Sequence, residues 1–214
     1  FTATIEGRSV WCATGGAGDE AFLLVPGYAA DHTGWMLTQP ALAAKGRVFA
    51  PDLPGGLLSS LDVGPGDIAF FARIVRGLMD HVGPERFHLV GHSMGAAIAV
   101  AVATAVPERV SKLTLIAPAG LDPWINMDFI SGFPLIRDQA AARPLMEMLV
   151  ANPRMIAPDM LRLVVAYTTL PGVREALETI AAANFPGSQA YLYRDRLDAL
   201  GMPVRVVWGA EDAI

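Results

Sequence analysis

The stretch FHLVGHSMGAAIAV, from Phe87 to Val100, contains the pattern G-x-S-x-G with Ser93 at its centre. A run rich in strand-forming residues precedes the serine and an alanine-rich run follows it, which is the setting of a nucleophile on a sharp strand-to-helix turn. Gly91 and Gly95 leave room for the close packing of such a turn, and the helix behind it directs N–H groups toward developing negative charge. We therefore predict that Ser93 is a catalytic nucleophile; the alternative is a chance occurrence of the pattern.

The loop VPGYAADHTGW, which follows the apolar run AFLLV, is a second candidate part of the site. A glycine just past a strand end, here Gly27, permits a turn that presents backbone N–H groups. A donor at Tyr28, together with the N–H of Met94, would form an oxyanion hole. In the alternative interpretation Pro26-Gly27 simply turns the chain, and His32 stays at the surface. The side chains considered for the pocket lining are His32, Trp35 and Met127.

An acid that could orient a catalytic base stands near the end of the chain. Asp212 follows the apolar run VRVVWG, and loops after parallel strands gather around the sites of open sheets. The order nucleophile, acid, histidine is one of those known for serine triads. Glu211 is adjacent, and spacing alone does not distinguish it from Asp212. Asp122 is a further candidate, but it would reach the base from a different loop. Asp52, at the end of RVFAPD, is expected to cap the turn that follows it.

The general base is the missing member of the set. Histidine occurs four times, and every one precedes Asp212. His92 adjoins the nucleophile, but neighbouring side chains at such a turn point apart, and His88 should face a helix layer from within a strand. His81 ends a helix, where it can interact with the last carbonyl groups. We therefore expect the base beyond Ile214, and only the residual catalysis of binding and the oxyanion hole without it.

Short apolar strands and helices alternate along most of the chain. This pattern predicts an α/β fold with a mostly parallel sheet covered by helices on both faces. The alternating stretch TATIEGRSVWCAT is broken at Glu6-Gly7, which indicates a hairpin. A helix is expected in MLTQPALAAK. Asp67 is the expected N-cap of the helix in DIAFFARIVRGLMDHV, and a further helix should run from the Ser93 turn to about Val106.

One long segment breaks the alternation. Residues 121–203 contain no strand pattern. Successive helices separated by Pro or Gly are predicted there, in RDQAAARPLMEMLVA, PDMLRLVVAYTTL and PGVREALETIAAA. We expect a helical cap, or lid, inserted there before the last strand. Residues 1–120 and 204–214 would then form the sheet-containing core.

Composition argues against several other functions. The chain has 214 residues, 53% hydrophobic and 17% charged, with a formal net charge of −5 and no basic run suited to nucleic acid. Cys12 is the single cysteine, no Cys/His cluster has zinc-ligand spacing, and we expect no metal and no cofactor. The longest apolar run, Met94 to Val106, is too short to span a bilayer. With no secretory signal in the sequence, we expect a cytoplasmic protein.

These motifs together resemble those of the α/β-hydrolase family, from the first strands to Asp212. The motifs that carry the resemblance are VPGYAADHTGW, APDLPGGLLSS, LVGHSMGAA and VVWGAEDAI. Within the family, LIAPAGLDPWINMDFISGF and LPGVREALETIA are similar to the hydrolase-like C-terminal domain of the dihydrolipoamide acetyltransferase component of acetoin dehydrogenase complexes. The resemblance implies Ser93 as nucleophile, Asp212 as acid, and backbone oxyanion donors at Tyr28 and Met94.

The chain departs from the family pattern at three places. The usual His-Gly before the oxyanion loop is Pro26-Gly27, and the usual Pro-Gly-His-Gly turn reads Pro54-Gly55-Gly56. The stretch that carries the family's catalytic histidine and final helix is absent from the sequence. The acetyltransferase likeness also implies an upstream lipoyl domain or subunits of a dehydrogenase complex as partners.

The sequence therefore predicts a serine-nucleophile enzyme that transfers an acyl group from a small carbonyl, ester or thioester substrate. The acceptor is water or a thiol such as dihydrolipoamide, because the same acyl-enzyme serves both. One alternative is a carbon–carbon bond hydrolase that uses the same residues on a diketone. Another is a non-catalytic domain of a dehydrogenase complex, which the altered loops at Pro26-Gly27 and Pro54-Gly55-Gly56 would favour.

Overall fold

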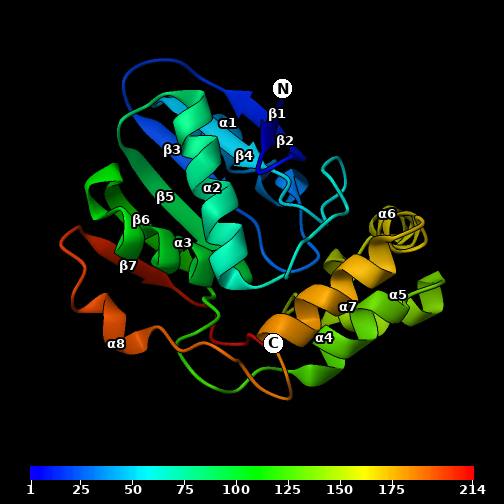
Figure 1. The fold of residues 1–214 in the computed structure, drawn as a ribbon. Helices are drawn as coiled ribbons and strands as arrows, with labels where there is room; N and C mark the ends of the chain where they lie inside the picture. The colour runs from blue at the N-terminus through cyan, green and yellow to red at the C-terminus, as the bar shows by residue number, and fades with distance from the viewer.

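Seven strands form one sheet, in the order β1-β2-β4-β3-β5-β6-β7, in the computed structural model, which describes residues 1–214 (Figure 1). All neighbours from β4 to β7 pair in parallel, whereas β1 with β2 and β2 with β4 pair antiparallel. The predicted mostly parallel α/β sheet is confirmed. The strands are β1 (Thr2–Ile5), β2 (Arg8–Gly15), β3 (Ala21–Val25), β4 (Arg47–Pro51), β5 (Phe87–His92), β6 (Val110–Ile116) and β7 (Val204–Val207).

The N-terminal hairpin forms at the predicted turn. Ile5 pairs with Arg8, so the two intervening residues make the whole connection. Glu6 and Gly7 both have positive φ, 48° and 77°. Two such residues form the kind of turn whose twist matches that of the flanking strands.

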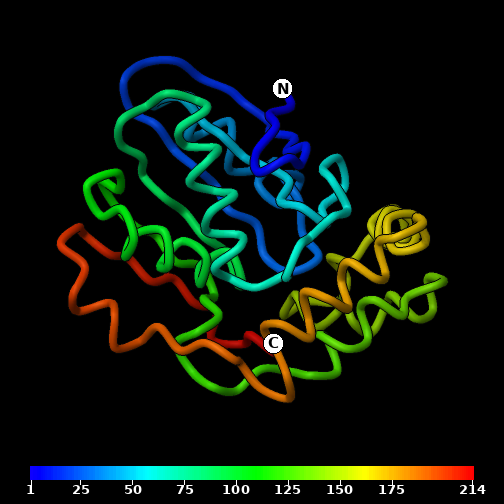
Figure 2. The backbone as a smooth tube through the Cα atoms, in the orientation of Figure 1, coloured from blue at the N-terminus to red at the C-terminus, as the bar shows by residue number.

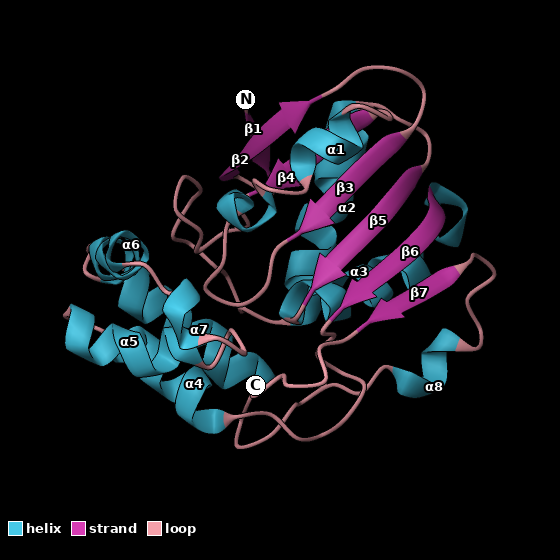
Figure 3. Ribbon diagram, turned by 180° about the vertical axis from the view of Figure 1, so that it is seen from behind, coloured by secondary structure: helices cyan, strands magenta, loops and turns pink.

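Helices cover both faces of the sheet, as predicted. α2 (Ile68–Val82) and α3 (Met94–Ala105) lie on one face, and the short α1 (Gln39–Ala43) lies on the other (Figures 1 and 3). Asp67 caps α2 as expected, because its Oδ1 accepts a hydrogen bond from the N–H of Phe70 at 2.7 Å. The predicted helix in MLTQPALAAK is shorter than the pattern suggested, since α1 begins only at Gln39 with a proline in its first turn.

A helical lobe, α4 to α7, lies beyond the carboxyl ends of the parallel strands (Figure 3). The chain leaves the sheet after β6, builds the lobe and returns to form β7 (Figure 2). The short α8 lies outside the lobe, near α3 of the core. The helices of this segment are α4 (Met127–Gly132), α5 (Gln139–Glu147), α6 (Pro158–Thr168), α7 (Val173–Asn184) and α8 (Arg194–Leu197).

The main apolar core lies between the sheet and α2 and α3, and it continues into the lobe. Every residue of β3 is buried, as expected for a central strand covered on both faces. Burying each large side chain of this core stabilises the fold by about 1.5–3 kcal/mol before chain entropy is counted. None of the helices is both long enough and apolar enough to cross a membrane.

Candidate active site

Ser93 occupies a strained turn between β5 and α3. Its backbone has φ 53° and ψ −123°, a conformation that residues with a Cβ rarely adopt. A Cβ added at Gly91 would lie 2.6 Å from the Cα of Ala96, and one at Gly95 would overlap the carbonyl oxygens of Val25 and Pro26. The two glycines therefore permit α3 to approach the sheet closely enough to hold the turn.

The backbone around Ser93 is fixed while its hydroxyl is left free. The N–H of Ser93 donates to the carbonyl of Ile116 at 2.9 Å, and its carbonyl accepts from Ala96 at 2.9 Å and Ala119 at 3.1 Å. Its Oγ forms no hydrogen bond with another protein group, and the residue is half-buried. A fixed backbone with an uncommitted hydroxyl is suited to nucleophilic attack.

The loop after β3 approaches Ser93 at Gly27. A Cβ added at Gly27 would lie 3.1 Å from the Cβ of Ser93. The next residue, Tyr28, has a backbone N–H that donates to no protein acceptor. Met94 is the first residue of α3, so its N–H is among those without a partner inside the helix. The two predicted oxyanion donors, Tyr28 and Met94, therefore each directly follow a residue of the Gly27–Ser93 approach.

Asp212 lies in an exposed turn five residues after β7. Its Oδ1 accepts the N–H of Ile214 at 3.0 Å, so this carboxylate closes a local turn. Asn126 holds the same turn, since its N–H and Nδ2 donate at 2.9 Å to the carbonyls of Ile214 and Ala213. Glu211 is also exposed and forms no hydrogen bond or ion pair, so contacts do not distinguish the two acids as the orienter of a base.

None of the four histidines pairs with Asp212. His92 is half-buried, with its ring edge-on to Trp35 at 6.5 Å. Burial lowers the pKa of His92, and the negative charge of Asp212 opposes that shift. The contacts of His88 are with neighbouring strands: its ring lies 5.4 Å from Phe22 of β3, and its Nε2 lies 3.0 Å from Thr114 Oγ1 of β6. Burial lowers the pKa of His88 too. His81 is exposed at the end of α2 and stacks on Phe1.

His32 pairs with Asp52, a contact that the sequence reasoning missed. Asp52 is fully buried, and its Oδ1 lies 2.8 Å from both the backbone N and the ring Nδ1 of His32. Its Oδ2 accepts the N–H of Leu58 at 3.0 Å, so it also caps the turn after β4, as expected. The pair joins the loops after β3 and β4, and His32 is therefore not a free pocket side chain.

Asp31, His32 and Asp52 also have potential metal-ligand atoms within 4.8 Å of one another. These groups already have partners, because three carboxylate oxygens accept N–H groups: Asp52 Oδ1 from His32, Asp52 Oδ2 from Leu58, and Asp31 Oδ1 from Thr33. The donor set is therefore satisfied by the protein itself. It gives no reason to assign a metal.

The other two predicted pocket residues, Trp35 and Met127, lie in different parts of the molecule. Trp35 is buried in a small apolar cluster on the α1 face of the sheet, and Met127 is half-buried at the start of α4. Asp122 accepts the N–H of Trp124 in the loop after β6, which gives it a local role.

Two hollows differ in their relation to Ser93. One of about 370 Å³ is bordered by Gly15, Arg47 and His81, at the amino ends of the parallel strands and far from the serine. The other, bordered by Met94, Ala119 and Phe185, holds only about 10 Å³. With the lobe in this position there is no room for a substrate beside Met94 in that hollow.

Comparison with known proteins agrees with the fold described above. The profile of a family described as alpha/beta hydrolase fold matches residues 20–214. The chain is 39% identical over 214 residues to the dihydrolipoyllysine-residue acetyltransferase component of the acetoin cleaving system of Pseudomonas putida, and 34% identical over 213 residues to that of Cupriavidus necator. Both alignments cover 99% of this chain and 57% of the relative, so the chain spans just over half of their length.

More distant proteins share the fold. A 2-hydroxy-6-oxononadienedioate/2-hydroxy-6-oxononatrienedioate hydrolase of Burkholderia vietnamiensis is 30% identical, over 92% of this chain and 72% of its own. The solved structure of a meta-cleavage product hydrolase from Pseudomonas fluorescens superposes with a TM-score of 0.87 at 20% identity, covering 98% of this chain and 79% of its own.

Proposed function

Because this chain belongs to the α/β-hydrolase family, we propose that it is a serine enzyme that transfers a small acyl group. The observation that supports this most directly is the strained φ of 53° at Ser93, with the Gly27–Tyr28 loop beside it. A backbone strain of this kind costs of order 1–3 kcal/mol and persists only where the surrounding structure enforces it. Strain at a serine in this sequence pattern favours the catalytic proposal over the non-catalytic alternative.

In the proposed reaction, Ser93 Oγ attacks the carbonyl carbon of the substrate and a base takes the hydroxyl proton. The carbonyl oxygen becomes an oxyanion that the N–H groups of Tyr28 and Met94 stabilise. The C–O bond to Ser93 forms, the leaving group departs with the proton from the base, and an acyl-enzyme remains. Water or a thiol then gives its proton to the base and attacks the acyl carbon, the bond from this carbon to Ser93 Oγ breaks, and the base returns the proton to Oγ.

We place the base on a histidine outside residues 1–214, oriented by Asp212. The four histidines of the chain have other positions: His32 pairs with Asp52, His88 with Thr114, and His92 packs against Trp35. We also propose that the helical lobe is a cap over the site. It lies beyond the strand ends that carry Ser93 and Asp212 (Figure 3).

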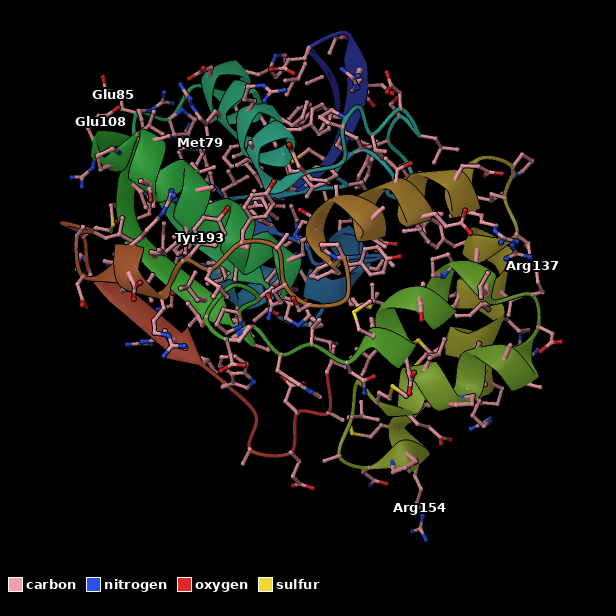
Figure 4. The ribbon with its side chains drawn as sticks, turned by 60° about the horizontal axis from the view of Figure 1, so that its bottom comes forward. Met79, Glu85, Glu108, Arg137, Arg154 and Tyr193 are labelled. Carbon is pink, nitrogen blue, oxygen red and sulfur yellow. The ribbon has the colours of Figure 1, made fainter.

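The buried residues favour an uncharged acyl group. The buried polar side chains of the chain are Asp52, Thr168 and Asn184, and none is basic. In the lobe, Arg137 and Arg154 lie on the outer side, away from the sheet (Figure 4). A substrate with two carboxylates, such as the dioates named for the hydrolase relatives, would lack a buried cation to pair with.

We therefore prefer acyl transfer of the kind named for the acetyltransferase relatives, with a dihydrolipoyl thiol or water as acceptor. A lipoyl domain or complex subunits would be partners of the whole protein in that case. The carbon–carbon bond hydrolase is the second candidate, supported by the 30% identical relative and by the shared fold.

Labelling of Ser93 by a fluorophosphonate tests the proposal. Folded full-length protein should be labelled at Ser93, and Ser93→Ala should abolish labelling while Ser131→Ala, at an exposed serine of α4, should not. A folded full-length protein that stays unlabelled would exclude the serine mechanism. Turnover of acetyl thioesters but not of a diketone dioate would then separate the preferred reaction from the second candidate.

A further inference from the structure

Tyr28 connects the Ser93 site to the helical lobe through its side chain. The residue is 6% exposed. Its ring packs edge-on against two aromatic rings of the lobe, with ring centroids 6.1 Å from Phe185 and 6.5 Å from Phe133. Its hydroxyl lies 3.2 Å from the carbonyl oxygen of Leu177 on α7 and 3.4 Å from that of Ile130 on α4. One phenol thus contacts two helices of the lobe at once.

The sequence of the lobe explains why the Ile130 carbonyl is available. A helical carbonyl normally accepts the N–H four residues later, and here that residue is Pro134, which has no N–H. α4 ends at Gly132, and the N–H of Phe133 bonds the carbonyl of Phe129 instead. The proline leaves the Ile130 carbonyl without a helical partner, and the Tyr28 hydroxyl occupies it.

The backbone of the same residue faces the nucleophile. Gly27 contacts Ser93, the N–H of Tyr28 has no protein acceptor, and Ala29 continues the loop with φ 55°. The N–H of Ala30 donates to the carbonyl of Gly27 at 3.3 Å and closes this turn. Tyr28 is the one residue of the turn whose side chain hydrogen-bonds the lobe.

Other hydrogen bonds between the lobe and the core go to different loops. Tyr167 of α6 donates to the carbonyl of Gly55, after β4. Asn184 of α7 bonds the carbonyl of Gly66 and the N–H of Ile68, before α2. These contacts can hold the lobe, but they do not touch the turn that carries the Tyr28 N–H.

We propose that Tyr28 is a positioning residue that couples closure of the lobe to assembly of the oxyanion hole. The inference rests on the proposed function. With the lobe closed, the phenol shares its one proton between the carbonyls of Leu177 and Ile130, and this anchor holds the Tyr28 backbone with its N–H available for the substrate oxygen. The hollow that Met94 borders holds only about 10 Å³, so with the lobe closed that hollow does not hold a substrate. In the proposed coupling, opening of the lobe would release the phenol and loosen the oxyanion turn.

The test compares Tyr28→Phe with Tyr167→Phe in the full-length protein. Each change removes one buried hydroxyl that links the lobe to the core, but only the first touches the oxyanion turn. With a p-nitrophenyl acetate probe, Tyr28→Phe should lower kcat about 10-fold with KM nearly unchanged, because the oxyanion hole acts in the transition state. Tyr167→Phe should leave kcat within about twofold.

Hydrogen exchange gives a readout that does not depend on activity. In Tyr28→Phe, exchange should rise in residues 26–32, which include the Ala30 N–H, and in α7; in Tyr167→Phe it should not rise in residues 26–32. Equal kcat values for the two variants, or unchanged exchange of residues 26–32 in Tyr28→Phe, would overturn the coupling. If the wild-type protein neither turns over the probe nor labels at Ser93, the proposed function fails, and the exchange comparison still decides the coupling.

Discussion

At the scale of single residues, Gly95 shows how little freedom the Ser93 turn allows. Any side chain there would meet the carbonyl oxygens of Val25 and Pro26, which belong to backbone and cannot rotate away. We expect Gly95→Ala to lower the free energy of unfolding by about 1–3 kcal/mol, as for other overpacked sites. Urea denaturation measures this.

A glycine with open space around it provides the control for Gly95. A Cβ at Gly34 meets nothing within 4 Å. Gly34→Ala should therefore change the free energy of unfolding by no more than about 0.5 kcal/mol. Equal stability of the two variants would show that α3 does not pack against the end of β3 as described.

His92 should make stability depend on pH. Burial lowers its pKa in the folded protein below the ordinary value of 6.5, so the unfolded chain binds the proton more readily. The free energy of unfolding should therefore fall as the pH drops below about 6.5, and level off below the lowered folded pKa. His88 is shifted in the same direction by its own burial and adds to the effect.

Substitution isolates the share that His92 contributes. Histidine titrates between about pH 8 and pH 5. Over this range, urea denaturation should show that the free energy of unfolding falls less steeply with decreasing pH in His92→Gln than in the wild type. A His92→Gln slope equal to that of the wild type would contradict the burial of this ring.

Some site residues could be predicted from the sequence and others could not, for a physical reason. Ser93, Gly91 and Gly95 lie in one short pattern, whose chemistry depends on neighbours in the chain. The pairing of His32 with Asp52 joins residues 20 positions apart, at the ends of β3 and β4. Those strands are neighbours only because of the sheet order, which local patterns do not specify.

At the scale of elements, α7 attaches the lobe to the core through Asn184. Its side chain is 3% exposed and bonds three backbone groups: the carbonyls of Gly66 and Ile180 and the N–H of Ile68. Asn184→Ala would leave a buried carbonyl and the first N–H of α2 without partners. We expect it to lower the free energy of unfolding by about 1–3 kcal/mol in urea denaturation.

A threonine on the same helix serves as the comparison. Thr179 is exposed and bonds only the carbonyl of Glu175, one turn earlier. Thr179→Ala should cost no more than about 0.5 kcal/mol. If Asn184→Ala were equally mild, the lobe would be held mainly by apolar contacts rather than by this amide.

Helix length decided which elements the sequence could predict. α5, α6 and α7 have 9 to 12 residues and follow the expected stretches RDQAAARPLMEMLVA, PDMLRLVVAYTTL and PGVREALETIAAA. α4 has only 6 residues and was missed. It is defined by the side-chain cap of Asn126 at its start and by Pro134 after its end, and so short a helix shows no periodicity.

At the scale of the whole molecule, the two faces of β7 differ from those of the inner strands. β7 pairs with β6 alone and forms the edge of the sheet (Figure 3). All four of its residues are exposed, including Val206 at 46% and Val207 at 47%, and Trp208 follows at 50%. An exposed apolar edge strand offers unpaired backbone groups to another chain.

We therefore expect a protein made of residues 1–214 alone to self-associate through β7. Sedimentation velocity over a concentration series should show reversible association, and Val206→Lys should suppress it, because a charge on an edge strand opposes strand addition. Leu163→Lys, which places the same charge on an exposed apolar residue of α6, should leave association unchanged. Association that persists in a folded Val206→Lys protein, or that Leu163→Lys abolishes, would move the contact from β7 to the lobe.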